Sequence, residues 1–402
     1  MTTPRVLMVP YGHSLAHVTR LLEIGRVLRA GGASVVFAGE GRYFNLIQQA
    51  GFPIQPLLEL SQSVVTSHAN RASLGFHSRK SVAAFVQAEL DLYRQLGPDI
   101  VVGDFRPTAR ISTRLASLPY AVVVNAMYTP YYSAWRRAPQ THPLTRIIPG
   151  KLIYCLLPLV PLINRCYCRP YNQVLRRHGQ PPISRIEQLF TGDLTLMADI
   201  PEYGPTRNRP PSFHYVGPIT WEPDCPPPSW LDALDRDRAT IYFTLGSTGS
   251  RRVFEIATAA FAGTDFQVLL TTGRQSAAES AGPWPANFRV ADLAPGRQLM
   301  AASHLLVFHG GNGTAYQALQ NGLPMIGIPA NLDQEWNVDR LVDIGVAEKI
   351  VLTKCSGPAL LATARQVLGD PSYRDKAHGL QDILRRYHGP ETAARLIAEF
   401  AE

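Results

Sequence analysis

The sequence predicts an α/β protein of two doubly wound, Rossmann-like domains that face each other across a cleft. Short apolar runs of strand length alternate with runs whose apolar residues recur at helical spacing, a pattern typical of parallel sheets covered on both faces. The chain has 402 residues, whereas a single core rarely serves more than about 250–300 residues. A proline-dense segment, 207–230, separates two such series and is interpreted as the interdomain linker.

The first series predicts an N-terminal domain over residues 1–208. A strand at 5–10 is followed by the loop GHSLAH and by a helix that begins near Val18 and stops at Gly31–Gly32. The alternation then continues through a strand at 33–39, a helix at 42–51, a strand at 99–104, a helix at 108–117 and strands at 120–126 and 193–203.

Residues 128–180 interrupt this alternation with many Tyr, Trp, Pro and Arg residues. The run 151–163 within them is too short for a secure membrane span, contains Lys151 and carries two prolines, so we do not expect it to cross a membrane. Two interpretations stay open for it. It packs as helix within the domain, or it forms an apolar wall for an acceptor or a membrane-facing patch.

The second series predicts a C-terminal domain over residues 209–383, with a last helix, 384–402, that packs back toward the first domain. The series is a strand and loop at 239–248, a helix at 253–264, and strands at 266–273, 288–295, 304–311 and 324–330. Ligands of doubly wound sheets bind at the carboxyl ends of the strands, so we expect the site there.

Composition narrows the class of function. The net charge of +8 favours anionic ligands or surfaces, but the basic residues are scattered, so no nucleic-acid partner is expected. Five cysteines, an odd number, argue against a disulfide framework, and Cys166 and Cys168 are too close together for a zinc site. Because a strand occupies 5–10, we expect no signal peptide and a cytoplasmic protein.

The motif HGGNGT, residues 309–314, lies between a strand and a helix. Backbone amides at a helix N-terminus carry unsatisfied donors and partial positive charge, which stabilise a diphosphate without a metal. Glycine lets the backbone approach the ligand, while Thr314 and His309 add side-chain donors. Taken alone, the motif fits a tight turn without a ligand equally well.

The segment 290–340 gives the motif its context. The motif is followed by Pro329 and the pair Asp333–Gln334, and in this combination the chain resembles the inverting, nucleotide-sugar-dependent glycosyltransferases of the GT-B fold that act on plant and bacterial natural products. The resemblance implies a donor site in the C-terminal domain and acceptor binding in the N-terminal domain. The donor-binding residues that it implies are Ser247, Pro295, Gln298, His309, Gly311, Asn312, Gly313, Thr314, Gln317, Asp333 and Gln334.

Asp333 and Gln334 offer planar acceptor and donor groups to sugar hydroxyls. One position departs from the family pattern: Gln317 stands where many members carry a glutamate that accepts from the ribose hydroxyls. The amide keeps an acceptor but loses the charge. The nucleoside is left open between uridine and thymidine.

A histidine of GHSLAH is the expected general base, because an imidazole titrates near working pH. The resemblance favours His17, in the loop before the first helix, and leaves His13 as the second choice. Asp104, at the end of the strand 99–104, is expected to fix the tautomer of the imidazole.

No cofactor and no metal are expected. The one D-x-D sequence, Asp235–Arg236–Asp237, lies on a charged stretch away from any glycine turn and is interpreted as solvated surface. The charge of the leaving group would be stabilised by His309, Thr314, Ser247 and the helix dipole.

The expected function is inverting transfer of a hexose from a UDP- or TDP-sugar to a hydroxyl of an apolar acceptor such as a polyketide, a phenol or a terpenoid. A lipid acceptor at a membrane surface, with peripheral membrane contact, is the alternative. A sugar-nucleotide epimerase of the same architecture ranks lower, because no cluster of carboxylates is visible. A non-catalytic auxiliary protein would lack the donor signature. The oligomeric state stays open between monomer and homodimer.

Overall fold

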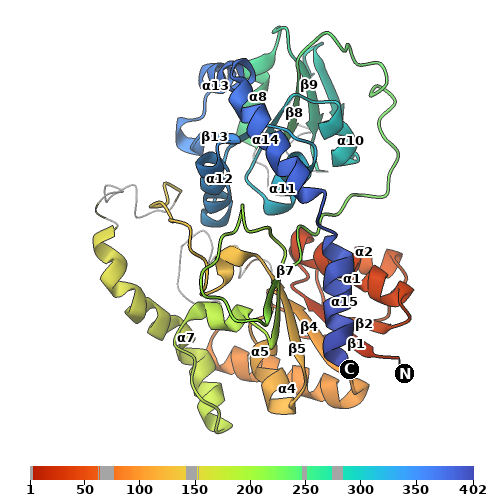
Figure 1. The fold of residues 1–402 in the computed structure, drawn as a ribbon, viewed down its shortest axis with the longest axis vertical. Helices are drawn as coiled ribbons and strands as arrows, with labels where there is room; N and C mark the ends of the chain where they lie inside the picture. Colours follow the sequence, from red (N-terminus) through yellow and green to blue (C-terminus); the bar gives the residue numbers. More distant parts are fainter. Residues whose placement is uncertain are drawn as a thin grey trace. The chain divides into compact units, whose positions relative to one another are not determined.

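The computed structural model describes residues 3–61, 63, 77–141, 152, 154–246, 251–273 and 284–402. The chain forms two compact units, shown in Figure 1. The first unit comprises Met1–Trp135, Lys151–Ile219 and Tyr387–Glu402. The second comprises Arg136–Gly150 and Thr220–Arg386.

The described strands of the first unit form one seven-stranded sheet in the order β3-β2-β1-β4-β5-β6-β7. Every neighbouring pair is parallel, as the alternation of strands and helices predicted. The strands are β1 (Arg5–Pro10), β2 (Ser34–Ala38), β3 (Ile54–Gln55), β4 (Ile100–Asp104), β5 (Tyr120–Val124), β6 (Leu194–Met197) and β7 (Phe213–Tyr215).

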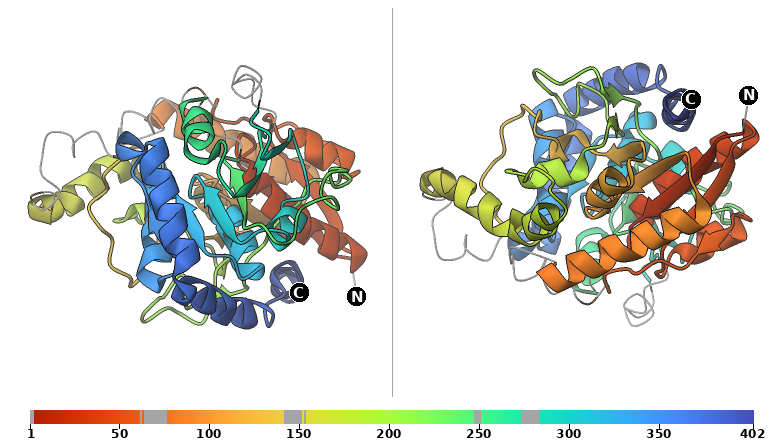
Figure 2. Two further views of the ribbon diagram at one scale, coloured as in Figure 1. Left: turned by 90° about the horizontal axis from the view of Figure 1, so that it is seen from above. Right: turned by 90° about the horizontal axis from the view of Figure 1, so that it is seen from below.

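Helices cover both faces of this sheet. They are α1 (Leu15–Ala30), α2 (Phe44–Gln49), α4 (Arg79–Leu96), α5 (Ala109–Ala116), α7 (Val160–Arg177) and α15 (Gly389–Ala401), with short 3₁₀ helices η1 (Ala126–Tyr128), η3 (Tyr154–Leu159) and η4 (Ile186–Phe190). Alternate residues of β1 point to opposite faces, so Met8 packs with α1 and α15 whereas Leu7 packs with Leu92 and Tyr93 of α4. Both Figure 1 and Figure 2 show α15 beside α1.

The described strands of the second unit form a six-stranded parallel sheet in the order β10-β9-β8-β11-β12-β13. They are β8 (Thr240–Thr244), β9 (Gln267–Thr271), β10 (Phe288–Ala291), β11 (Leu305–Phe308), β12 (Met325–Gly327) and β13 (Ala347–Lys349). The helices are α8 (Arg251–Phe261), α10 (Gly296–Ala301), α11 (Asn312–Gln320), α12 (Leu332–Ile344), α13 (Gly357–Gly369), α14 (Pro371–Leu384) and the 3₁₀ helix η5 (Leu352–Lys354). One face of the sheet packs on α8 and α13, where Phe243, Phe254 and Leu360 are buried.

The units divide at other residues than the boundaries expected at 208 and 384. The chain stays in the first unit through Ile219, because β7 lies inside the proline-dense segment and pairs with β6 as the last strand of the sheet. Interpreting the whole of 207–230 as linker was therefore wrong. The chain returns to the first unit at Tyr387, and Arg136–Gly150 belongs to the second unit rather than the first.

Each sheet has one point where the strand order reverses direction. In the first unit this point lies between β1 and β4, and in the second it lies between β8 and β11. Loops that leave neighbouring strands in opposite directions open a crevice at such points, where doubly wound proteins bind ligands. The residues after β1, β4, β8 and β11 are therefore the first places to look for a site.

Candidate active site

His17 and Asp104 meet at the switch point of the first unit. Asp104 ends β4 and lies beside Pro10, the last residue of β1. His17 lies in the first turn of α1, so its predicted place in the loop before the helix was wrong by a few residues. The helix begins earlier because Ser14 already takes the N-cap position. The Nδ1 atom of His17 lies 2.7 Å from Oδ1 of Asp104, as the expected pairing requires.

The surroundings of Asp104 fix which ring nitrogen of His17 holds the proton. Arg20 donates from Nε to Oδ2 and from Nη2 to Oδ1 of Asp104, each at 2.8 Å. A carboxylate that takes two bonds from one guanidinium is ionised and can only accept. Nδ1 of His17 must therefore donate to Asp104, although Nη2 of Arg20 also lies 3.0 Å from it. The lone pair of the neutral ring is then on Nε2.

The polar network continues along the strand ends. Arg20 donates to Oδ1 of Asn125, which follows β5, at 2.8 Å. Asn125 donates in turn to Asp199, which follows β6, at 3.2 Å. Asp104 is 1 % exposed and Arg20 is 7 % exposed, while the side chain of His17 keeps 21 %. A buried hydrogen-bonded network thus holds one partly exposed imidazole.

An aromatic stack continues from the imidazole. The rings of His17 and Phe105 are stacked with centroids 4.9 Å apart, and Phe105 stacks on Phe190 at 5.1 Å. Phe105 has a φ of 57°, in the left-handed region that a bulky residue rarely adopts. Such strain persists only where the surroundings over-determine it, and it is common at functional sites.

A pocket adjoins this stack within the first unit. Its aromatic walls are Tyr11, Phe85, Phe105, Tyr167 and Phe190, and its polar groups include Glu59, His77 and Arg106. Burial, followed by the charge of Arg106, lowers the pKa of His77 to about 4, so this ring is neutral near pH 7. A largely aromatic pocket with few polar groups suits an apolar ligand.

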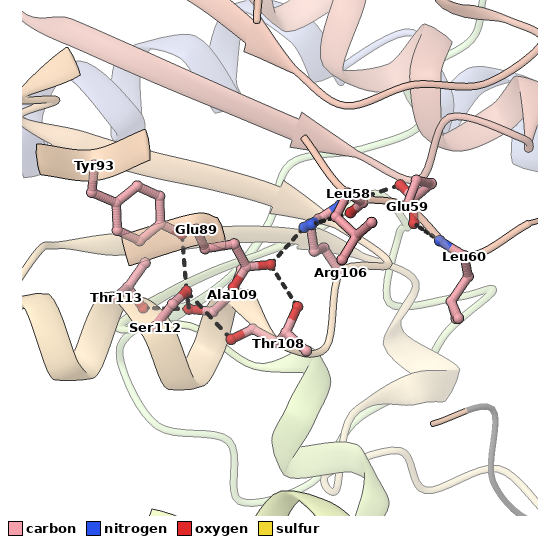
Figure 3. A network of polar contacts seen from close by, with 10 residues as sticks. All are labelled: Leu58, Glu59, Leu60, Glu89, Tyr93, Arg106, Thr108, Ala109, Ser112 and Thr113. Atoms are coloured by element: carbon pink, nitrogen blue, oxygen red, sulfur yellow. Dashed lines mark hydrogen bonds and ion pairs between the residues drawn. The ribbon is translucent and has the colours of Figure 1, made fainter. Parts of the chain in front are cut away.

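Arg106 is held by a buried network, drawn in Figure 3. Nε of Arg106 donates to Glu89 at 2.7 Å, and Nη2 donates to the carbonyl of Leu58 at 2.8 Å. The hydroxyl of Thr108 donates to the same Glu89 oxygen at 2.6 Å. Burial raises the pKa of Glu59, and the nearby charge of Arg106 offsets part of that rise. These contacts fix the loop that follows Asp104 and carries Phe105.

The glycine-rich turn of the second unit follows β11 at its switch point. The helix α11 begins at Asn312, and its N-cap residue, Gly311, has no side chain that could accept from the first amides. The first amides of a helix have no intrahelical partner, and here the N-cap residue supplies no side-chain partner. Among the described residues, no atom lies within 4 Å of a Cβ atom built on Gly313, so none of them covers this end of the helix.

The other glycines allow the loop after β8 and the start of α12 to approach the turn that carries His309. A Cβ on Gly311 would lie 2.6 Å from Nε2 of His309. A Cβ on Gly246, which follows β8 and has a φ of 57°, would lie 2.8 Å from Cε1 of the same ring. A Cβ on Gly310, with a φ of 95°, would lie 2.6 Å from the carbonyl oxygen of Gln334. Close backbone approach, rather than flexibility, explains these glycines.

His309 is neutral in this setting, because burial lowers its pKa to about 4. Its Nδ1 and the Nδ2 of Asn312 are buried with no hydrogen-bond partner in the described part of the chain. Buried polar atoms without partners are rare in native proteins, and each one calls for an explanation. A bound anion that accepts from both nitrogens is one such explanation.

The pair Asp333–Gln334 lies in the first turn of α12, and its two side chains differ. Asp333 is exposed, whereas Gln334 is only 5 % exposed and its Oε1 accepts from the amide of Ala330 at 2.9 Å. Asn337 of the same helix donates to the carbonyl of Gly310 at 3.1 Å. The start of α12 is thus fastened to the glycine-rich turn.

The remaining predicted donor residues lie around α10 and α11, which pack together. Pro295 is the buried N-cap residue of α10, and Gln298 is exposed in its first turn. Gln317 of α11 donates to the carbonyl of Trp221 at 2.9 Å. Ser247 lies outside the described residues. Asp235 and Asp237 are exposed, and the described residues contain no cluster of three His, Cys, Asp or Glu side chains suited to a metal.

Glu335 was not predicted from the sequence. It is fully buried and accepts from the amides of Gln140 and Thr141, each at 2.8 Å, and from Lys349 at 3.0 Å. Burial alone would raise the pKa of Glu335, but these hydrogen bonds, with one from the Thr141 hydroxyl, hold it below its ordinary value. The carboxylate ties the segment that begins at Arg136 to the helix that carries Asp333.

Arg20, Asn125 and Asp199 were also missed. A signal was present for each of them. Arg20 stands three residues after His17, so both share one side of a helix. Asn125 directly follows the apolar strand β5, and Asp199 lies two residues after the apolar strand β6. Polar residues at the carboxyl ends of parallel strands gather at the same edge of the sheet.

Comparisons with known proteins place this arrangement in a family. Residues 256–398 match the family described as erythromycin biosynthesis protein CIII-like, C-terminal domain. The chain is 33 % identical over 395 residues to the PGL/p-HBAD biosynthesis glycosyltransferase of Mycobacterium tuberculosis, covering 97 % of this chain and 90 % of the relative. It is 33 % identical over 386 residues to the PGL/p-HBAD biosynthesis rhamnosyltransferase of Mycobacterium bovis, covering 95 % and 84 %.

Solved structures share the whole fold. The glycotransferase of kitacinnamycin superposes with a TM-score of 0.75 at 20 % identity over 100 % of both chains. The spinosyn rhamnosyltransferase SpnG complexed with spinosyn aglycone gives 0.72 at 17 % identity, covering 98 % of this chain and 100 % of that one. The glycosyltransferase VinC in complex with dTDP gives 0.68 at 18 % identity, covering 99 % of each.

The fold is the GT-B fold, as the sequence indicated. The chain belongs to the family of GT-B natural-product glycosyltransferases that includes the PGL/p-HBAD biosynthesis glycosyltransferases. It is therefore a glycosyltransferase. None of the helices in the described part of the chain combines the length and apolar character of a membrane span.

Proposed function

We propose that this glycosyltransferase moves a hexose from a UDP- or TDP-sugar to a hydroxyl of an apolar acceptor, with inversion at the anomeric carbon and without a metal. The observation that carries the proposal is the His17–Asp104 pair: with Nδ1 bonded to Asp104, Nε2 of a partly exposed imidazole is left available at the switch point of the first unit. Such a group is a competent general base near neutral pH.

In the proposed reaction, Nε2 of His17 takes the proton of the acceptor hydroxyl as its oxygen attacks the anomeric carbon. The bond between that carbon and the diphosphate oxygen breaks in the same displacement, which inverts the configuration. The electron pair leaves on the diphosphate. The imidazolium that forms is stabilised by Asp104, its partner at 2.7 Å.

The diphosphate would lie at the N-terminus of α11. The first-turn amides and the helix dipole suit a leaving group that gains negative charge. So do the nitrogens of His309 and Asn312 that have no partner among the described residues. Asp333, exposed at the start of α12, would accept from hydroxyls of the sugar. The structure of VinC in complex with dTDP supports TDP rather than UDP as the nucleotide of the donor.

The acceptor would occupy the aromatic pocket beside Phe105. A soluble polyketide, phenol or terpenoid suits its walls, and SpnG was solved with a spinosyn aglycone. A lipid acceptor is the second candidate, because exposed apolar side chains gather at the start of α7.

The test is transfer itself. UDP- and TDP-hexoses, rhamnose included because one relative is named a rhamnosyltransferase, would be incubated with pooled acceptors in excess EDTA. Mass spectrometry detects the product, and NMR reports its anomeric configuration. Product of inverted configuration is the expected result. A retained configuration, a need for Mg²⁺ or Mn²⁺, or turnover of the donor in the absence of acceptor would contradict the proposal, the last by favouring an epimerase.

A further inference from the structure

Exposed apolar side chains gather in one part of the first unit. Among the described residues, eight large hydrophobic side chains are exposed, and five of them are Trp135 and members of the segment 152–162. These five and their exposures are Trp135 (68 %), Leu152 (54 %), Leu159 (47 %), Val160 (42 %) and Leu162 (57 %). The rings of Trp135 and Tyr154 lie 5.5 Å apart, which joins the tryptophan to the segment. We call these five side chains the apolar tip.

The apolar tip lies at the N-terminal end of α7, with Val160 and Leu162 in the first turn of the helix and Leu159 directly before it. The other half of α7 is packed. Tyr171 and Val174 of α7 are buried with Val82 and Val86 of α4. The first turns of α7 extend beyond the rest of the first unit in Figure 1 and in both views of Figure 2. Because burial of apolar side chains stabilises proteins, a contiguous group of them left exposed points to a partner that covers it.

The charge that follows the apolar tip says what kind of partner this is. Arg165, Arg169 and Arg176 follow Leu162 at helical spacing, so the four side chains form one exposed stripe on the side of α7 opposite Tyr171. The helix contains no Asp or Glu, and none of the three arginines pairs with an acidic residue in the described part of the chain. At about 1.5 Å per residue, Arg165 and Arg169 stand about 5 and 10 Å behind Leu162.

We propose that the apolar tip inserts into an anionic membrane surface, with Arg165 and Arg169 at the lipid phosphates. Interfacial helices bury their apolar faces about 5–10 Å into the headgroup boundary, which matches the offset of the arginines. Tryptophan is enriched at that depth. A second copy of the chain fits less well, because a symmetric contact would place two arginine stripes together in a protein of net charge +8.

The experiment measures vesicle binding by co-sedimentation, without donor or acceptor, so that its result is independent of the transfer reaction. The wild-type protein is expected to bind vesicles in which about one lipid in three is phosphatidylglycerol and the rest is phosphatidylcholine. It should bind vesicles of pure phosphatidylcholine more weakly. Leu159→Asp/Leu162→Asp should weaken binding to both vesicles at least about tenfold. Arg165→Gln/Arg169→Gln should weaken binding to the anionic vesicles about 25-fold, at about fivefold per arginine, and abolish the preference for them.

Two variants serve as matched controls. Phe400→Asp changes an exposed apolar residue outside the apolar tip, and Arg236→Gln changes an exposed arginine of the second unit. Both should bind vesicles like the wild type. The proposal is overturned if the wild type ignores anionic vesicles, or if the Leu159→Asp/Leu162→Asp protein binds them unchanged. It is also overturned if sedimentation shows a dimer that this variant dissociates while vesicle binding persists, which would assign the surface to a second copy.

Discussion

The substitution Asp104→Asn probes the polar network from its centre. The carboxylate accepts from His17 and twice from Arg20, and it is 1 % exposed. The asparagine amide has one acceptor and one donor group, so it cannot satisfy both neighbours. When its NH₂ group faces His17, it donates to Nδ1, and the proton of the imidazole moves to Nε2. The ring then has no lone pair for the acceptor hydroxyl.

The magnitudes follow from these contacts. Removing one partner of a buried ion pair costs about 3–5 kcal/mol, and the retained acceptor of asparagine argues for the lower end, about 3 kcal/mol. For a unit of this size each kcal/mol lowers Tm by about 2–4 °C, so we expect a fall of about 6–12 °C. The rate of the chemical step should fall about 10²–10⁴-fold, because the base is held in the wrong tautomer.

The assay combines single-turnover transfer at saturating donor and acceptor with thermal unfolding followed by circular dichroism. Asp193→Asn is the matched control, because Asp193 pairs with Arg110 at 2.7 Å on the surface of the same unit. A surface pair contributes about 0–1 kcal/mol, so this variant should keep the wild-type rate and nearly its Tm. If Asp104→Asn transfers sugar within threefold of the wild-type rate, the proposed orientation of His17 is refuted.

Three further predictions concern the second unit and pH. Gly313→Ala should unfold at a slightly higher temperature, since alanine gains about 1 kcal/mol in a helix and its Cβ would meet no atom of the described residues within 4 Å. The same variant should bind a nucleotide diphosphate more weakly in calorimetry. An unchanged affinity would place the diphosphate elsewhere. His309→Ala should weaken the binding of free nucleotide diphosphate and of intact donor alike, whereas Asp333→Ala should weaken only the binding of intact donor. Equal losses of affinity for the two ligands in Asp333→Ala would contradict the assignment of Asp333 to the sugar hydroxyls. His77 and His309 have native pKa values of about 4, so the unfolded state binds more protons than the native state between about pH 6.5 and 4. The urea midpoint of unfolding should therefore decrease as the pH is lowered through that window, and the decrease should be smaller in His77→Gln. A urea midpoint that increases toward pH 4 would contradict this prediction.

Much of the fold could be predicted because its strands are buried on both faces. Apart from Arg5 at the start of β1 and Asp104 at the end of β4, these two strands carry no polar side chain, and parallel sheets produce such runs. β7 could not be predicted in the same way. It has three residues, lies among prolines and adds to the edge of the sheet, so its pairing depends on β6 rather than on its own pattern. The segment that begins at Arg136 joins the second unit through Glu335, a contact that local sequence does not reveal.

The candidate site was predictable where a local motif carries it. HGGNGT is a local strand-to-helix motif, so the turn after β11 and the presence of a helix beyond it could be predicted, although α11 begins at Asn312, inside the motif rather than after it. The polar partners of His17 depend on which strands become neighbours. Asn125 lies 105 residues after Arg20, and Asp199 lies 74 residues after Asn125. Only the order of the strands in the sheet brings these residues together. Gln334 likewise looks like a ligand-binding side chain in the sequence but also fastens its own loop.

The most direct test of the account is the single-turnover rate of His17→Ala at saturating donor and acceptor, with donor affinity measured in parallel. We predict a loss of about 10²–10⁴ in rate with donor affinity nearly intact, because the predicted donor residues lie in the other unit. His13→Ala is the control and should keep most activity, since the structure gives Asp104 to His17. An inactive His13→Ala beside an active His17→Ala would move the base to His13, and full activity of both would contradict the His17–Asp104 mechanism.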